Sequence, residues 1–499
     1  MDIVVIGSGF GGLAAAIRLQ AQGHQVTIVE KLDMAGGRAY VFEQDGFSFD
    51  AGPTIITAPW LLHELFALGG KRTEDYVRLV LLDPFYNIRF EDGSVFHYNA
   101  NREALVRQVR EFSPNDVDGY LRFLDSGQDI FNAGMALLDK PFLTPMSMVK
   151  VLPELIRLRA DRSVATYAAR FMKDERLRQV FSFHPLLVGG NPFRASSIYA
   201  LIHTLEQQWG VWFCMGGTGA LVRGLVQLFE ELGGTIRYES EVAEITMQSG
   251  ARRATGVRLI NGESIRADTV VCNGDVAQAY RTLLPPSVRP SMSDAKIARM
   301  RFSMSLFVIY FGTNKQYENI AHHEIIMGPR YRELLEDIFE RKILADDFSL
   351  YLHRPTATDP SLAPPGHDCW YVLSPVPHLG GDVDWERVSQ RYRDRIMAYL
   401  EERYMPGLSQ HIVTERRIDP RYFEQTLNSY LGSAFGPEPT LTQSAYLRPH
   451  NVSPDIPNLF FCGAGTHPGA GLPGVIASGK IVAEMIGTVH TGRQLVAHD

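Results

Sequence analysis

Cysteine is scarce in this sequence, and its few copies lie far apart. The 499 residues contain four cysteines, and no two of them form a C-x-x-C pair: Cys214, Cys272, Cys369 and Cys462. This spacing argues against a disulfide framework and against a cysteine-ligated metal cluster. We therefore predict no metal site and a protein of the reducing cytoplasm.

Long apolar runs, repeats and an excess of basic charge are also lacking. No run of about eighteen apolar residues occurs, so no transmembrane helix is predicted. We expect no cleavable targeting segment, because the first predicted strand begins at residue 2 or 3. The formal net charge of -7 gives no support to nucleic-acid binding. The length allows about three domains.

The first thirty residues contain the clearest motif of the chain. Ile3–Ile6 is an apolar run that predicts a buried strand, and GSGFGG supplies G-x-G-x-x-G directly after it. Leu13–Gln20 predicts a helix, and Gln25–Val29 predicts a second strand that ends on Glu30. This order favours an adenine dinucleotide site over a bare βαβ unit, which would leave four glycines unexplained. NAD and FAD both remain open at this point.

Each residue type of the motif has a physical role. Gly7 allows the tight turn, Gly9 lets a pyrophosphate approach the backbone, and Gly12 lets the helix pack close to the strand. The helix N-terminus offers unpaired N–H groups to the phosphates. The carboxylate of Glu30 can accept hydrogen bonds from ribose hydroxyls.

A second glycine-rich step follows the acidic residue. Gly36-Gly37-Arg38 combines two flexible residues with a guanidinium. An extended cofactor would meet this loop after its adenosine, and Arg38 is suited to bidentate pairing with phosphate oxygens. Alone, the same tripeptide would be read as an ordinary surface turn.

The middle of the chain predicts a hairpin, a helical region and further strands. Val77–Asn99 reads as a hairpin that turns at Asp92-Gly93, and residues 102–208 read as helices interrupted by prolines. Strands are expected at 235–238, 241–245, 257–259 and 268–272, and we interpret them as returns to the nucleotide-binding sheet. Later strands are expected at 302–312, 348–352 and 370–373, with helices at 331–339 and 386–404. Their aromatic residues suit core packing or an apolar ligand channel.

The segment 150–178 differs from the rest of the chain in charge. It contains eight basic and four acidic residues, a local balance of +4. Apolar residues lie beside the bases in an amphipathic pattern: Val151, Leu152, Leu155, Ile156 and Leu158. A helix of this kind suits an anionic lipid surface, and it equally suits a core-facing helix with a solvated basic face.

The C-terminal part repeats the strand–turn–helix pattern. Leu459–Cys462 predicts a buried strand, 463–474 is rich in glycine and proline, and Val475–Ile486 predicts a helix. The expected helix N-terminus at Gly474-Val475 can face a developing negative charge. A reduced flavin develops such a charge and a nicotinamide does not, so this unit favours FAD.

Several segments together resemble one family. GSGFGGLAAAIRL, AGGRAY, FSFDAGPTIIT, FSFHPLLVGGNPF, GGTGALVRGL, VVCNGD and CGAGTHPGAGLPGVIASG resemble the bacterial, lycopene-forming phytoene desaturases, within the amine-oxidase-like flavoproteins. The likeness runs from end to end. The N-terminal motif is shared across the superfamily, whereas GTHPGAGLPGV and FHPLLVGGNPF are more specific. One departure is Cys272-Asn273-Gly274-Asp275, where the family usually has Asn-Ala-Asp.

The resemblance implies an α/β fold (α+β overall) with three parts. These are a discontinuous Rossmann-type FAD-binding domain (1–70, 216–290 and 442–499), a mixed-sheet substrate domain (71–105 and 291–441) and a helical lid with membrane contact (106–215). The residues expected at the cofactor are Gly7, Ser8, Gly9, Phe10, Gly11, Gly12, Glu30, Lys31, Gly36, Gly37, Arg38, Gly52, Pro53, Thr54, Val242, Gly463, Gly465, Thr466, Gly474, Val475 and Ile476.

The resemblance also implies a reaction and a location. The enzyme would dehydrogenate 15-cis-phytoene stepwise to lycopene, with hydride transfer to flavin N5 and loss of a proton. The expected acceptor of the electrons is oxygen or a quinone, and the expected location is peripheral, on the cytoplasmic side of the cell membrane. No residue is singled out as the proton acceptor, and the number of steps and the oligomeric state are left open.

Five other functions fit parts of the pattern. A desaturase for a thirty-carbon substrate, a carotene isomerase and a ketolase are close alternatives. An amine oxidase is more distant. A non-catalytic prenyl-binding carrier would need a filled or incomplete flavin site, and here both glycine-rich ends are intact.

Overall fold

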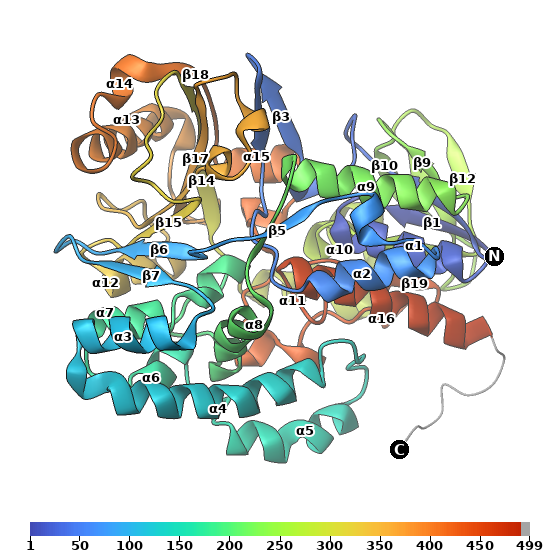
Figure 1. The fold of residues 1–499 in the computed structure, drawn as a ribbon. Helices are drawn as coiled ribbons and strands as arrows, with labels where there is room; N and C mark the ends of the chain where they lie inside the picture. The colour runs from blue at the N-terminus through green and yellow to red at the C-terminus, as the bar shows by residue number, and fades with distance from the viewer. Residues whose placement is uncertain (491–499) are drawn as a thin grey trace.

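A five-stranded parallel sheet gathers distant parts of the chain. The structure, a computed structural model, describes residues 1–490. The strand order is β19-β13-β1-β2-β9, and every neighbouring pair is parallel. The bounds are β1 Asp2–Ile6, β2 Gln25–Val29, β9 Thr235–Arg237, β13 Thr269–Cys272 and β19 Leu459–Phe461. The first, middle and last segments of the chain therefore meet in one sheet, as Figure 1 shows.

Both faces of this sheet are covered, which explains the apolar residues in its central strands. Ile3 and Val5 of β1 pack on the helices α1 (Phe10–Ala21), α2 (Pro59–Leu68), α9 (Gly217–Glu231) and α16 (Leu472–His490). Val4 points to the opposite face and packs with α10 (Val276–Leu283) and with a small separate sheet. Because successive side chains of a strand point to opposite faces of the sheet, Ile3 and Val5 contact one layer of helices and Val4 contacts the other layer.

That small sheet corrects one sequence-based prediction. β10 (Val242–Met247), β11 (Ala254–Leu259) and β12 (Ser264–Arg266) pair antiparallel with one another in a sheet of their own. The prediction that 241–245 and 257–259 return to the nucleotide-binding sheet was wrong. Short connections join antiparallel neighbours, whereas a parallel sheet needs a longer crossover before each added strand. Of the expected returns, 235–238 and 268–272 do join it as β9 and β13.

A seven-stranded mixed sheet forms the second half of the molecule. Its order is β18-β14-β17-β16-β15-β6-β7, antiparallel except for the β15–β6 pair. The bounds are β6 Tyr86–Arg89, β7 Val95–Tyr98, β14 Ser305–Thr313, β15 His323–Ile326, β16 Leu350–His353, β17 Asp368–Val376 and β18 Ile412–Ile418. The predicted hairpin at Asp92-Gly93 is confirmed as β6–β7.

The long strand β14 of this sheet separates two apolar clusters. Phe307 and Ile309 of β14 pack on one side with α13 (Trp385–Arg403). Leu306 and Val308 point the other way, into the largest cluster of the protein. That second side also borders a cavity, so β14 links the core to the candidate site.

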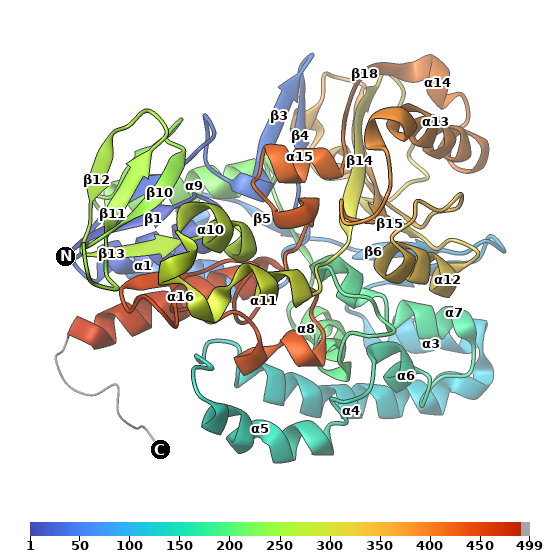
Figure 2. The same ribbon diagram turned by 180° about the vertical axis from the view of Figure 1, so that it is seen from behind.

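Helices between residues 102 and 209 lie beneath both sheets in the two views (Figures 1 and 2). Their bounds are α3 Arg102–Phe112, α4 Val117–Met135, α5 Pro145–Arg157, α6 Val164–Ala168, α7 Glu175–Val180 and α8 Leu201–Trp209. α5 lies at the outer edge and contains no buried residue. The predicted helical region is confirmed, and no helix within residues 1–490 is long and apolar enough to cross a membrane.

The remaining elements are short or lie at the edges. Two two-stranded pairs occur, β3 (Val41–Gln44) with β4 (Phe47–Asp50) and β5 (Leu79–Leu81) with β8 (Trp212–Cys214). The other α-helices are α11 Asp294–Arg299, α12 Tyr331–Glu336, α14 Leu408–His411 and α15 Pro420–Gln425. Six strands were not predicted from the sequence: β3, β4, β8, β12, β15 and β18. The three-part domain division stays a proposal.

Candidate cofactor and substrate site

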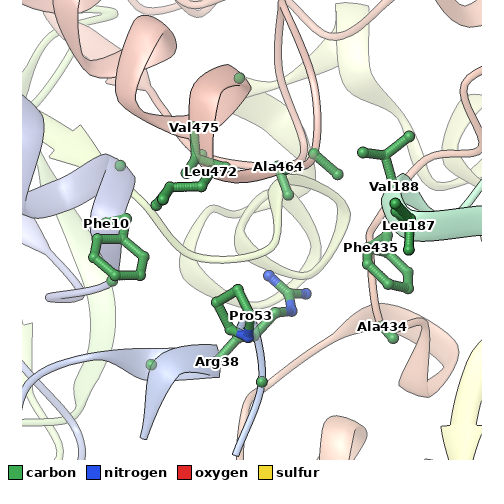
Figure 3. Close-up of a pocket in the computed structure, with 18 of the residues that line it drawn as sticks. Phe10, Arg38, Pro53, Leu187, Val188, Ala434, Phe435, Ala464, Leu472 and Val475 are labelled. Carbon is green, nitrogen blue, oxygen red and sulfur yellow. The ribbon is translucent and has the colours of Figure 1, made fainter. Parts of the chain in front are cut away.

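One cavity of about 670 Å³ extends from the turns of the parallel sheet to the seven-stranded sheet and α8. In Figure 3, Phe10 lies on one side of the cavity and Leu187, Val188 and Phe435 lie on the other. Arg38 and Pro53 lie between them. We call its two parts the dinucleotide end, beside β1 and β19, and the apolar end, beside β14 and α8.

Most of the predicted cofactor residues line the dinucleotide end. They are Gly7, Gly9, Phe10, Gly11, Glu30, Lys31, Gly36, Gly37, Arg38, Gly52, Pro53, Thr54, Val242, Gly463, Gly474 and Val475. The others lie behind this wall: Ser8, Gly12, Gly465, Thr466 and Ile476. Both groups come from the segments that the parallel sheet brings together.

The glycine-rich turn after β1 is packed too tightly for side chains. A Cβ on Gly12 would lie 2.1 Å from the carbonyl oxygen of Gly7. A Cβ on Gly11 would lie 2.6 Å from Oδ1 of Asn273 and 2.9 Å from Cα of Gly463. The N-terminus of α1 has no side-chain cap. Its free N–H groups therefore suit a phosphate that approaches the backbone closely.

Glu30 is held in place by its own chain. Its Oε2 accepts hydrogen bonds from the backbone N–H of Ser8 at 2.8 Å and from the Ser8 hydroxyl at 2.6 Å. Its Oε1 accepts from the N–H of Leu32 at 2.9 Å. Oε2 thus accepts two hydrogen bonds and Oε1 accepts one, so a ribose hydroxyl can still donate to Oε1. Ser8 thus positions Glu30 rather than lining the cavity.

Arg38 and Asp275 are buried charged groups on the cavity wall. Desolvation lowers the pKa of the Arg38 guanidinium, partly offset by the charge of Asp275. Desolvation raises the pKa of Asp275, opposed by the backbone N–H of Gln278 and by Arg38. Arg38 donates one hydrogen bond to Oγ of Ser429 at 2.9 Å, while its Nε and Oδ2 of Asp275 have no partner.

These unpartnered atoms test whether a dinucleotide fits. Buried polar atoms without partners are costly, and phosphate oxygens and hydroxyls would satisfy them. Lys31 is engaged elsewhere, since its Nζ donates to Oδ1 of Asn428 at 3.0 Å and pairs with Glu241 at 3.4 Å. The residues at this end fit the phosphates and ribose of FAD.

The C-terminal turn closes the same end. The N–H of Gly463 donates to Oγ of Ser478 at 2.7 Å, and a Cβ on Gly474 would lie 2.6 Å from the carbonyl oxygen of Gly469. α16 begins at Leu472, so the helix starts before the expected Gly474-Val475. Pro473 extends the first turn because proline is compatible with that position. Leu472 and Val475 lie side by side above the cavity (Figure 3).

The residues behind the wall support the turn. A Cβ on Gly465 would lie 2.7 Å from Cγ1 of Val276. The Thr466 hydroxyl accepts from Nδ2 of Asn451 at 3.3 Å, and Ile476 lies in the core. Asn273 was not predicted, although it lines the cavity and touches both glycine turns. Its position directly after β13, in the segment VVCNGD, is the sequence feature that could have identified Asn273 as a site residue.

A group of buried hydroxyls and imidazoles joins the two ends. The Thr54 hydroxyl lies 2.9 Å from the Tyr351 hydroxyl and 3.0 Å from the Tyr371 hydroxyl. The Tyr351 hydroxyl lies 2.7 Å from Nδ1 of His323, which lies 3.2 Å from Nδ1 of His353. All three residues with hydroxyls line the cavity.

The same imidazoles form a group that by distance could hold a metal ion. His322, His323 and His353 offer ring nitrogens within 4.8 Å of one another. Desolvation, then the charge of Arg354, lowers the pKa of His322 to about 3. The cationic Arg354 also disfavours a second cation at this place. We therefore assign these rings to the hydrogen-bond network.

The apolar end is built from side chains of several elements. Leu306 and Val308 of β14, Met304 just before β14 and Leu373 of β17 line one part of it. Ile202 and Leu205 of α8 line another part, together with Leu186, Leu187 and Val188. Few polar groups interrupt this wall. Such a surface binds a hydrocarbon by apolar burial and offers little to a charged ligand.

Comparison with known proteins places the chain among flavoproteins. A family model described as flavin containing amine oxidoreductase matches residues 10–487. The chain is 52% identical to a lycopene-forming phytoene desaturase of Pseudescherichia vulneris over 97% of this chain and 98% of that protein. It is 44% identical to a neurosporene-forming phytoene desaturase of Cereibacter sphaeroides, over 97% and 94%.

A solved structure supports the fold. The chain superposes on a redesigned putrescine oxidase with a TM-score of 0.65, at 14% identity and over 99% of both chains. At this identity the likeness bears on the fold alone. It confirms the predicted α/β class with its dinucleotide-binding sheet.

Proposed function

This chain belongs to the flavin-containing amine oxidoreductases and, within them, to the phytoene desaturases, and we propose that it dehydrogenates 15-cis-phytoene stepwise to lycopene. It is an FAD-dependent oxidoreductase, as the sequence predicted. The observation that carries the proposed substrate is the continuity of the dinucleotide end with an apolar end in one cavity.

The cofactor would be held by the dinucleotide end. Glu30 would bind ribose hydroxyls, while the N-terminus of α1 and Arg38 would bind the pyrophosphate. When bound, FAD supplies a two-electron oxidant that accepts a hydride. The full set of predicted cofactor residues remains a proposal, with Ser8, Gly12, Gly465, Thr466 and Ile476 acting through the residues they support.

The apolar end would recognise the hydrocarbon by shape and burial. Burial of apolar surface contributes roughly 25 cal/mol per Å². Leu306, Val308 and Leu373 would orient the reacting carbons and exclude water. An amine substrate would leave its polar group unpaired against the same wall, which disfavours an amine oxidase.

A membrane surface would supply such a substrate. Met148 and Leu155 of α5 line the cavity, while four apolar side chains of the same helix point outward, with exposed fractions of 49% to 65%: Met146, Val149, Leu152 and Ile156. Leu447, beside α5, is also exposed. The alternative of a core-facing helix is not supported, because α5 has no buried residue. We propose peripheral contact with the cytoplasmic face of the cell membrane.

The electrons would pass finally to oxygen or to a membrane quinone. An apolar helix resting in the lipid surface favours a quinone, because quinones dissolve in the same lipid layer as the substrate. Comparison of aerobic turnover with anaerobic turnover in quinone-containing vesicles separates the two acceptors.

Purified protein with FAD and phytoene in liposomes tests the proposal. Flavin absorbance and coloured products with extended conjugation are expected, and chromatography identifies how many steps occur. Side-by-side assays with a thirty-carbon substrate, with carotene isomers and with ketolase substrates address the close alternatives. A colourless protein that binds no flavin and forms no product from any polyene would support a carrier and contradict the proposal.

A further inference from the structure

One carboxylate stands apart from all others that line the cavity. Within residues 1–490, four acidic side chains line it, and Glu30, Glu241 and Asp275 belong to the dinucleotide end. Glu206, on α8, is the fourth and lies next to Leu205 on the apolar wall. Its side chain is fully buried.

Glu206 has one oxygen engaged and one free. The Tyr86 hydroxyl donates to Oε1 at 2.8 Å. Oε2 lies 3.2 Å from Nε2 of His184 but accepts no hydrogen bond in the described chain. A buried carboxylate with an unsatisfied oxygen is costly beside a hydrocarbon ligand, so a purely structural role explains its position poorly.

A chain of polar side chains leads away from this carboxylate. Nε2 of His184 lies 3.3 Å from the Tyr98 hydroxyl, which also bonds Nδ1 of His203. Tyr120 of α4 packs on His203, and Tyr86 of β6 packs on His323 of β15. A proton taken up by Glu206 could therefore be shared with His184 and relayed inward, away from the substrate.

We propose that Oε2 of Glu206 accepts the proton that the substrate loses in each dehydrogenation, with His184 and Tyr86 as positioning residues. The inference rests on the proposed function. One carbon loses hydrogen with both electrons, as hydride, to the FAD oxidant. On the adjacent carbon the C–H electron pair becomes the new C=C π bond, and its proton forms an O–H bond with Glu206. The substrate is oxidised by two electrons, and charge balances.

Isosteric substitution gives the first test. Glu206→Gln keeps an oxygen for the Tyr86 hydroxyl but cannot take up the proton. Turnover should fall about 100-fold or more, with little change in KM and in bound flavin, because general bases contribute 10²–10⁴ in rate. Glu206→Asp should retain part of the rate. Glu111→Gln, an exposed substitution on α3, is the matched control and should equal the parent.

The pH dependence of turnover distinguishes a role of Glu206 in the reaction from a purely structural role. The parent should lose turnover at acid pH, as a reaction that needs a general base does, and Glu206→Gln should lack that acid limb. The groups facing Glu206 are Tyr86, Tyr98 and His184. A Tyr86→Phe variant should keep the limb while lowering turnover modestly, because the carboxylate remains.

A readout without turnover completes the experiment. Infrared difference spectra of the protein should contain a carboxylate band that is absent from Glu206→Gln. Binding of lycopene, already dehydrogenated at the bonds concerned, should shift that band. An unshifted band, or a Glu206→Gln turnover within twofold of the parent, overturns the inference. If the parent itself makes no product from phytoene, the proposed function fails instead.

Discussion

The two ends of the cavity differ in what builds them. At the dinucleotide end the backbone forms much of the wall, and added Cβ atoms at Gly11 or Gly12 would collide with it. At the apolar end the wall is made of side chains from β14, β17 and α8. A backbone wall tolerates almost no substitution, whereas a side-chain wall tolerates changes that keep volume and polarity. Cofactor binding and substrate binding should therefore be separable by mutation.

Gly11→Ala should have the largest effect. The added Cβ would collide with Asn273 and Gly463 and displace the turn between β1 and α1. We therefore expect the affinity for flavin to fall about 100-fold or more, which is equivalent to about 2.7 kcal/mol of binding free energy. Flavin absorbance of the purified protein measures this. Gly274→Ala is the matched control, because its Cβ would meet nothing closer than 3.5 Å and its φ is not positive. Equal flavin content in both variants would contradict the comparison.

The substitution Leu306→Asn should weaken substrate binding at the apolar end and leave flavin binding unchanged. The amide would lie unpaired in the apolar wall, at a cost of about 2 kcal/mol, so KM for the polyene should rise about 30-fold. Bound flavin should stay at the parent level. Leu306→Met keeps volume and polarity and serves as the control. Loss of flavin from Leu306→Asn would show that the two ends are not separable.

Acid should weaken the hydrogen-bond network around His322. Desolvation holds its folded pKa at about 3, below the unfolded value of about 6.5. The unfolded state then binds more protons between these values. Stability is therefore full above pH 6.5 and falls by about 1.4 kcal/mol per pH unit as the pH drops toward 3.

Melting temperatures between pH 7.5 and 5 measure this dependence. His322→Asn should show a shallower decline than the parent, because the titrating ring is gone. His63→Asn, at an exposed position of α2, should keep the parent slope. Identical slopes in all three proteins would refute a role for His322 in acid sensitivity.

Ile156→Glu should have the smallest effect. The side chain is 65% exposed on α5, so the fold should be unchanged, and vesicle binding should fall about threefold through lost apolar contact and added negative charge. Flotation with anionic liposomes measures this. Val413→Glu, exposed on β18, is the control. A parent protein that does not float would contradict membrane contact altogether.

Local patterns were sufficient for the elements at the dinucleotide end. The β1–α1–β2 unit, Glu30 and the glycine turn after β19 follow from motifs in which neighbours in sequence are neighbours in space. The apolar end was less predictable. β15 and β18 were missed, because their residues carry no strict alternation and gain strand structure from pairing with β16, β6 and β14. Tertiary context overrides weak local propensity in such strands.

The cofactor class, the strand–turn–helix units at both ends of the chain and the amphipathic character of 150–178 follow from the amino-acid sequence. These features depend on short spacings that backbone geometry enforces. Three other features are visible only in the folded chain: β10 and β11 form a separate sheet, α5 keeps its apolar face exposed beside the cavity, and Glu206 lies on the apolar wall. These depend on contacts between residues far apart in the chain, which no local pattern encodes.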